Sequence, residues 1–209
     1  MGNINELKGF TRGQLDAALM KIGHDVGMGT KEAIEAFLRD ELVVKMSERV
    51  WKTWMTIKLG RQKSVEEIRQ ALKASGNNIS DWANDILGKP AFTVSETEQD
   101  VELVNVSVEE LGFKQSACYA DICKRALELG LDLCPAEVGP QLRLQYKDQP
   151  KGTYVVVAMN AITDSDGDLL VFSVERCDDG DRYLDAGSGN VGNIWVASNR
   201  FVFLRRKTD

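Results

Sequence analysis

The sequence predicts an α+β fold, in which an N-terminal helical part is followed by a helix packed on an antiparallel β-meander that can curl into a partial barrel. Two observations predict it. Apolar residues recur at helical spacing behind capping residues in the first part of the chain. Short β-branched and aromatic runs alternate with Asp-Gly turns in the last part. With 209 residues and 43% apolar side chains, the chain can bury a core without disulfides or metals.

Residues 1–90 form the predicted helical region. Thr11 begins a capping-box pattern, and Thr30 can cap a second helix after a glycine-rich loop. Residues 11–45 are therefore expected to form a helical hairpin. We expect this hairpin to serve in packing or dimerisation, so that a homodimer through residues 11–45 is one of the expected partner arrangements.

Two further helices are expected before position 90. Ser64 opens a capping box for a helix that stops at Ser75-Gly76, and Ser80 caps a short helix that ends at Gly88. The segment 51–59 fits either of two structures. Its β-branched residues favour a strand, but a preceding helix could also continue through it, and both alternatives stay open.

Residues 91–209 form the second predicted domain, a mixed α/β domain, and the acidic segment 95–100 marks the expected boundary. A helix over residues 119–129 is expected to cover one face of the meander. The turns 164–168 and 178–181 contain Asp-Gly, which favours hairpins between antiparallel neighbours. The predicted strands of the meander are 142–146, 153–162, 169–177, 183–184 and 201–204.

A basic, tryptophan-containing segment interrupts a chain whose net charge is −6. Basic and aromatic side chains in one stretch suit contact with phosphates and stacking on bases. The alternative is that the tryptophans pack in a core while the lysines face solvent, and the overall acidic charge of the chain opposes a polyanion. The candidates for nucleic-acid contact are Lys45, Arg49, Trp51, Lys52, Trp54 and Lys58.

Neither a metal nor another cofactor is expected. The four cysteines have no CxxC spacing, and His24 is the only histidine. They are expected to be reduced thiols that pack as small apolar side chains. The run 164–168 places Glu175 at the twelfth position of a calcium loop, but Leu169 stands where an EF-hand needs glycine. No Walker loop or GxGxxG motif precedes a predicted helix.

The most distinctive segment is Cys134-Pro-Ala-Glu-Val-Gly-Pro140, followed by the predicted strand 142–146. Strand alternation would place Arg143 and Gln145 on one face. Glu137, Arg143 and Tyr146 are candidates for acid/base catalysis, and Glu137, Arg143 and Gln145 for binding a ligand or partner. The alternative is a structural ion pair that pins the loop to the sheet.

Three segments carry a resemblance to a known family. They are residues 131–150, with the pattern LCPAEVGPxLRLQYxDQP, together with Ile79–Leu87 and Arg200–Lys207. The chain resembles, from about residue 56 onward, a family of bacterial proteins with no assigned function, many from environmental and candidate-phylum genomes. The resemblance implies no activity, cofactor or catalytic residue.

The absence of a nucleophile–base pair favours a non-enzymatic binding or interaction module acting on a protein partner. Whether the protein is an enzyme stays open. One alternative is an enzyme with hydrolase-type acid/base chemistry around Glu137 and Arg143. Another is a nucleic-acid-associated accessory protein that uses residues 45–63. The N-terminus has no apolar leader and the sequence no membrane-length apolar run, so a cytoplasmic location without membrane contact is expected.

Overall fold

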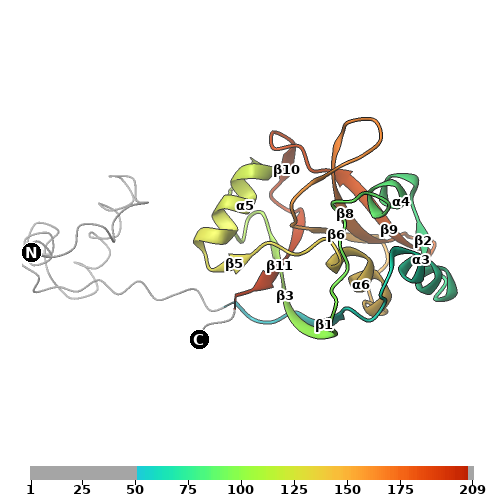
Figure 1. The fold of residues 1–209 in the computed structure, drawn as a ribbon. Helices are drawn as coiled ribbons and strands as arrows, with labels where there is room; N and C mark the ends of the chain where they lie inside the picture. The colour runs from blue at the N-terminus through green and yellow to red at the C-terminus, as the bar shows by residue number, and fades with distance from the viewer. Residues whose placement is uncertain (1–50, 207–209) are drawn as a thin grey trace, which may run out of the picture. The chain divides into compact units, whose positions relative to one another are not determined.

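The structure is a computed structural model that describes residues 51–206 (Figure 1). The predicted hairpin 11–45 and the candidates Lys45 and Arg49 lie outside the described residues. The described residues belong to one compact unit. The predicted division near residue 90 falls inside this unit, because strands from both sides of that position pair in one sheet.

A curled, open sheet in the form of a half-barrel makes up the core of this unit. Along its main path the strand order is β1-β3-β11-β6-β8-β9-β2, and β5 and β7 pair on β11 and β8 beside that path. The strands are β1 (Met55–Leu59), β2 (Asn78–Ile79), β3 (Gln99–Ser107), β5 (Leu131–Asp132), β6 (Thr153–Val157), β7 (Ile162–Thr163), β8 (Leu169–Arg176), β9 (Arg182–Ser188) and β11 (Arg200–Arg205). A separate two-stranded ribbon consists of β4 (Ser116–Cys118) and β10 (Ile194–Val196).

The predicted α+β class is confirmed, and the predicted meander is confirmed only in part. β6, β8 and β9 pair antiparallel, with the 164–168 and 178–181 turns on either side of β8. However, β11 pairs parallel with β6 and antiparallel with β3, so the sheet is mixed. The meander stops at β9 because the chain leaves the sheet to form β10 before it returns as β11.

Four helices lie in the described residues, and local signals predicted three of them. The helices are α3 (Val65–Ala74), α4 (Asp81–Leu87), α5 (Tyr119–Glu128) and α6 (Val138–Gln145). Ser64 Oγ accepts a hydrogen bond from Glu67 N, and Ser80 Oγ accepts one from Ala83 N. Both predicted N-caps are therefore confirmed. The open alternative at 51–59 resolves to the strand β1.

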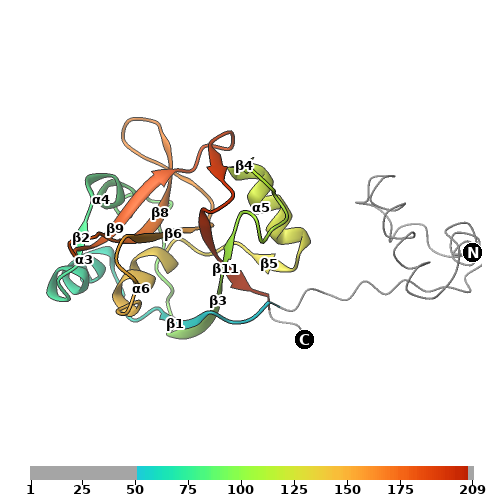
Figure 2. The ribbon, with the colours of Figure 1, turned by 180° about the vertical axis from the view of Figure 1, so that it is seen from behind.

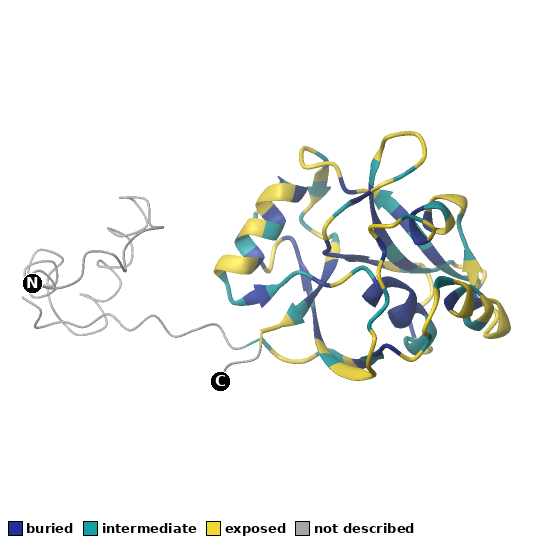
Figure 3. Ribbon diagram, in the orientation of Figure 1, coloured by how far each residue is buried: buried dark blue, intermediate teal, exposed yellow. Residues whose placement is uncertain are grey.

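The prediction of a strand over 142–146 is wrong, because residues 142–145 form the end of α6 and Tyr146 is its C-cap. This helix contacts β1 at one end of the main sheet, and β8 and β9 towards the other, so it fills the open side of the half-barrel (Figures 1 and 3). Six of its residues are buried on several sides. A helix that is buried on all sides has no solvent-facing polar stripe at helical spacing, so the usual sequence signal of a helix is absent. The alternation of apolar and polar residues over 142–146 therefore indicates a strand instead.

Candidate functional site

Glu137 precedes α6 and is only 1% exposed. Its Oε1 accepts a hydrogen bond from Gly60 N at 2.7 Å, and its Oε2 accepts one from Ser95 N at 2.8 Å. Both carboxylate oxygens thus bind main-chain donors of the segments that flank α3 and β3. This carboxylate holds loops in place and is not presented to a substrate.

Gln145 lies eight positions after Glu137 and binds the open edge of β1. Its side-chain amide donates to Lys58 O and accepts from Lys58 N, both at 2.9 Å. Gln141, between the two in the helix, donates to Gln62 Oε1 at 2.8 Å. Residues spaced by four share one face of a helix. This face of α6 therefore satisfies main-chain groups that β1 would otherwise leave unpaired at the sheet edge.

Arg143 and Tyr146 bind other parts of the chain. Arg143 is 1% exposed and donates to Gln149 Oε1, Glu175 O and Tyr146 O. The Tyr146 ring packs edge-on against Trp54, with a centroid separation of 4.9 Å, and burial raises the pKa of its hydroxyl. The Glu137 carboxylate shares no hydrogen bond with Arg143 or Tyr146, and Arg143 binds only the main-chain oxygen of Tyr146, not its hydroxyl. The sequence-predicted catalytic trio is therefore not assembled into one site.

The candidates for nucleic-acid contact that lie in the described residues have structural partners, apart from the exposed Lys52. Trp51 Nε1 donates to Leu129 O at 2.8 Å, and Trp54 packs on Tyr146. Lys58 Nζ lies 3.0 Å from Asp100 Oδ1 and 3.4 Å from Glu98 Oε1, and its bond to Asp100 raises its pKa. The tryptophans pack against the core, as the packing alternative expects, and this geometry does not assemble a base-stacking surface.

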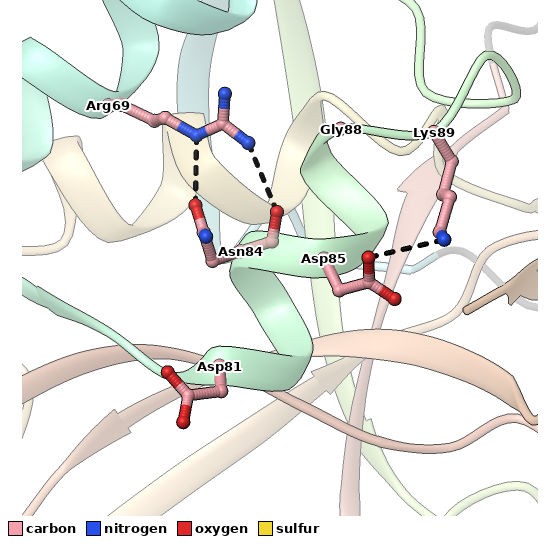
Figure 4. A pocket seen from close by; sticks show the side chains of 6 residues that line it. All are labelled: Arg69, Asp81, Asn84, Asp85, Gly88 and Lys89. Atoms are coloured by element: carbon pink, nitrogen blue, oxygen red, sulfur yellow. Dashed lines mark hydrogen bonds and ion pairs between the residues drawn. The ribbon is translucent and has the colours of Figure 1, made fainter. Parts of the chain in front are cut away.

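A shallow polar hollow of about 340 Å³ lies between α3 and α4 (Figure 4). Arg69 Nε donates to Asn84 Oδ1, and Lys89 Nζ forms an ion pair with Asp85 at 3.2 Å. Ser165, from the 164–168 turn, donates through its N–H and its hydroxyl to Asp85, and these bonds hold the pKa of that carboxyl below its ordinary value. The polar groups beside the hollow therefore connect α4 to this turn. Its lining residues are Arg69, Asp81, Asn84, Asp85, Gly88 and Lys89.

Three of the six large apolar side chains that are exposed in the described residues lie within six positions of one another, in β10 and in the turn just before it. Val191 is 62%, Ile194 62% and Val196 54% exposed. We call these three side chains the apolar ribbon. Between Ile194 and Val196, Trp195 points the other way and packs edge-on against Phe201 of the core at 5.2 Å. β10 is thus anchored by one side chain and presents its two neighbours to solvent.

The main chain of Ile194 also faces away from β4. Tyr119 N donates to Asn193 O, and Ala197 N donates to Gln115 O. In an antiparallel pair the hydrogen-bonded positions alternate, so the odd-numbered residues bond to the β4 side and the N–H and C=O of Ile194 point away from it. Val196 N binds Asn199 Oδ1, which caps that peptide group. Within residues 51–206 the N–H and C=O of Ile194 have no hydrogen-bond partner.

Sequence reasoning missed this surface, because residues 187–193 are rich in glycine and asparagine and indicate a loop. One signal was available. Residues 186–199 contain no charged side chain, in a chain whose residues are 28% charged. A long uncharged stretch near the surface is a mark of an interface.

Comparisons of this chain with protein-family models, with curated proteins and with solved structures give no match. Within residues 51–206 no group of three or more histidine, cysteine, aspartate or glutamate side chains is placed to hold a metal ion. The four cysteines, all in this part of the chain, are free thiols. No helix in the same part of the chain has the length and apolar character needed to span a membrane.

Proposed function

We propose that this protein is a non-enzymatic interaction module, and that its apolar ribbon binds an extended apolar segment of a partner protein. The observation that carries the proposal is the exposure of Val191, Ile194 and Val196 within one short uncharged stretch. The catalytic candidates Glu137 and Arg143 are by contrast buried, and their polar atoms bind other parts of the fold.

The exposed edge of β10 supports an extended partner. Proteins usually protect a free strand edge with charged residues, proline or a covering loop. Within the described residues, the edge at Ile194 carries neither a charged residue nor a proline, and its N–H and C=O point outward. An added strand would form two hydrogen bonds with this residue, and its own apolar side chains would lie beside those of Ile194 and Val196.

The ribbon is also held firmly enough to bind without first becoming ordered. Trp195 packs on Phe201, and Asn199 binds the main chain of Val196 on both sides, through its side chain and its N–H. A surface that is already ordered avoids part of the entropy lost on binding. Its small area favours a transient complex over a permanent one.

Selection from a displayed library of random linear peptides tests the proposal. The immobilised full chain is expected to enrich peptides with alternating apolar residues. A synthetic version of an enriched peptide is then titrated against the wild type and against the double variant Ile194→Lys/Val196→Lys. We expect the double variant to bind at least tenfold more weakly, because two charges would be placed in an apolar contact.

Trp82→Lys is the matched control, since Trp82 is equally exposed, at 60%, but lies on α4. It is expected to leave peptide affinity unchanged. Equal affinity of the double variant and the wild type would contradict the proposal. Light scattering of the wild type, if it shows a dimer that the double variant abolishes, would instead identify a second copy of the chain as the occupant.

A further inference from the structure

Three arginines converge at one end of the half-barrel from three different elements. Arg176 ends β8 and Arg182 begins β9, and the two residues are directly opposite in the strand ladder. Arg143 reaches the same region from α6, which lies beside β8 and β9 in both views (Figures 1 and 2). Burial and the positive charges of Arg182 and Arg176 lower the pKa of Arg143 to about 10. Arg143 and Arg176 both donate to Gln149, and the Arg143 guanidinium lies close enough to the other two arginines to be repelled by them.

No carboxylate balances these charges in the described part of the chain. The ion pairs found there involve none of the three arginines. Arg143 donates only to oxygens of neutral groups, and Arg176 donates to the main-chain oxygen of Gln149 at 2.6 Å. Glu175 directly precedes Arg176 in β8, but successive side chains of a strand point to opposite faces of the sheet, so Glu175 lies on the face opposite Arg176. Asp185 lies on the same face as Glu175, and burial and the negative charge of Asp185 raise the pKa of the Glu175 carboxyl.

Two donors in this cluster are buried without an acceptor. The Nε atoms of Arg143 and Arg176 are inaccessible to solvent and have no hydrogen-bond partner. Burial of a charged donor without an acceptor is unfavourable, and repulsion within the cluster adds to that cost. An oxyanion bound at the half-buried Arg182 would offset this repulsion with its negative charge, and its oxygens can accept from a guanidinium group in a planar, bidentate geometry.

We propose that Arg143, Arg176 and Arg182 form a binding site for the oxyanion group of a small molecule, a phosphate or a carboxylate. The side chain of Arg182 is half-buried and makes no hydrogen bond within residues 51–206, so it is the arginine that meets the ligand first. This site is separate from the apolar ribbon and does not depend on the proposed function.

Gln149 is the positioning residue of the site. It is fully buried, its Oε1 accepts from Arg143 at 2.6 Å, and its main-chain oxygen accepts from Arg176. Its Nε2 donates to Thr153 O and Val174 O, both at 3.0 Å. These four bonds hold two of the three guanidinium groups in a fixed relation to the sheet.

Calorimetric titration and thermal unfolding of the full chain test this site, with sodium phosphate and sodium acetate as probes at an ionic strength kept constant with sodium chloride. We expect saturable binding of one probe, and a Tm raised by about 5 °C or more at a hundredfold excess over Kd. Binding of phosphate alone assigns a phosphate ligand, and binding of acetate alone assigns a carboxylate ligand. No binding of either probe overturns the proposal.

Arg182→Gln should weaken binding of the active probe at least tenfold while the protein remains folded, since the Arg182 side chain makes no hydrogen bond in the described fold. Arg182→Lys keeps the charge without the planar fork and should bind with intermediate affinity. Arg61→Gln removes an exposed arginine outside the cluster and should bind like the wild type. Full affinity in Arg182→Gln would also overturn the proposal.

Discussion

At the scale of single residues, α6 shows how polar side chains can be conspicuous in a sequence and still serve the fold. Glu137 and Gln145 suggested chemistry because carboxylates and amides often bind ligands. In the structure they bind the main chain of residues 58, 60 and 95. The distinctive segment 131–150 includes this same helix, so its conspicuous residues lie in the interior of the half-barrel.

Gly139 is the residue of α6 for which the packing leaves least freedom. A Cβ atom added there would lie 2.7 Å from the Cβ of Phe172 on β8. Gly139→Ala must therefore move the helix away from the sheet, and we expect it to lower the free energy of unfolding by about 1–3 kcal/mol, as overpacking does. Urea unfolding followed by tryptophan fluorescence measures the change.

Gly192→Ala is the matched control for this substitution. An added Cβ at Gly192 would meet no atom within 4 Å, so its free energy of unfolding should stay within about 0.5 kcal/mol of the wild type. If Gly139→Ala were as stable as this control, the close approach of α6 to β8 would be wrong.

At the scale of elements, what the sequence could predict depended on how local each signal was. Ser64 and Ser80 bind main-chain N–H groups three positions later, and both helix starts were predicted. The strand prediction over 142–146 failed because the alternation of Leu142, Arg143, Leu144 and Gln145 comes from burial on several sides of a helix. The partners of that helix lie up to 87 positions away, and no local pattern reveals them.

The bond between α6 and β1 gives a prediction for these two elements. Gln145→Ala leaves Lys58 N and Lys58 O without their side-chain partner, and we expect a loss of about 1–3 kcal/mol of stability. The amide of Lys58 should also exchange its hydrogen faster, because the free edge of β1 would open to water. Hydrogen exchange followed by mass spectrometry of peptides that contain residues 55–60 measures this.

Gln70→Ala removes the same side chain from an exposed position of α3 and should affect neither measurement by a comparable amount. Unchanged exchange at residues 55–60 in Gln145→Ala would show that the side-chain amide does not protect the sheet edge.

At the scale of the whole molecule, the sequence did not predict the order of the strands in the sheet. Adjacent pairs such as β8–β9 follow from Asp-Gly turns, but β11 lies between β3 and β6 because its buried residues Phe201 and Phe203 complete the core. The apolar ribbon was missed for a related reason. Three consecutive apolar residues do not show which of them face solvent, and only the packing of Trp195 on Phe201 places Ile194 and Val196 on the outer face.

The same core buries ionisable groups in their neutral form, which makes the stability of the whole fold depend on alkaline pH. Tyr119 donates to Met159 O at 2.7 Å, and burial raises its pKa far above its ordinary value of 10.0. Burial likewise raises the pKa of Cys134 far above 9.0 and that of Cys123 to about 11. The folded state holds these protons at pH values where the unfolded chain releases them.

Stability is therefore expected to be independent of these groups below about pH 9 and to fall above it. The unfolded state ionises first, so Tyr119 and Cys134 each remove about 1.4 kcal/mol for every pH unit above their ordinary pKa. Urea midpoints measured from pH 7 to pH 11 should decline from pH 9 onward. Tyr119→Phe removes one ionising group and should make that decline shallower, whereas Tyr183→Phe, at a half-buried position, should follow the wild-type slope. Equal slopes for Tyr119→Phe and the wild type would mean that Tyr119 ionises as readily in the folded core as in the unfolded chain.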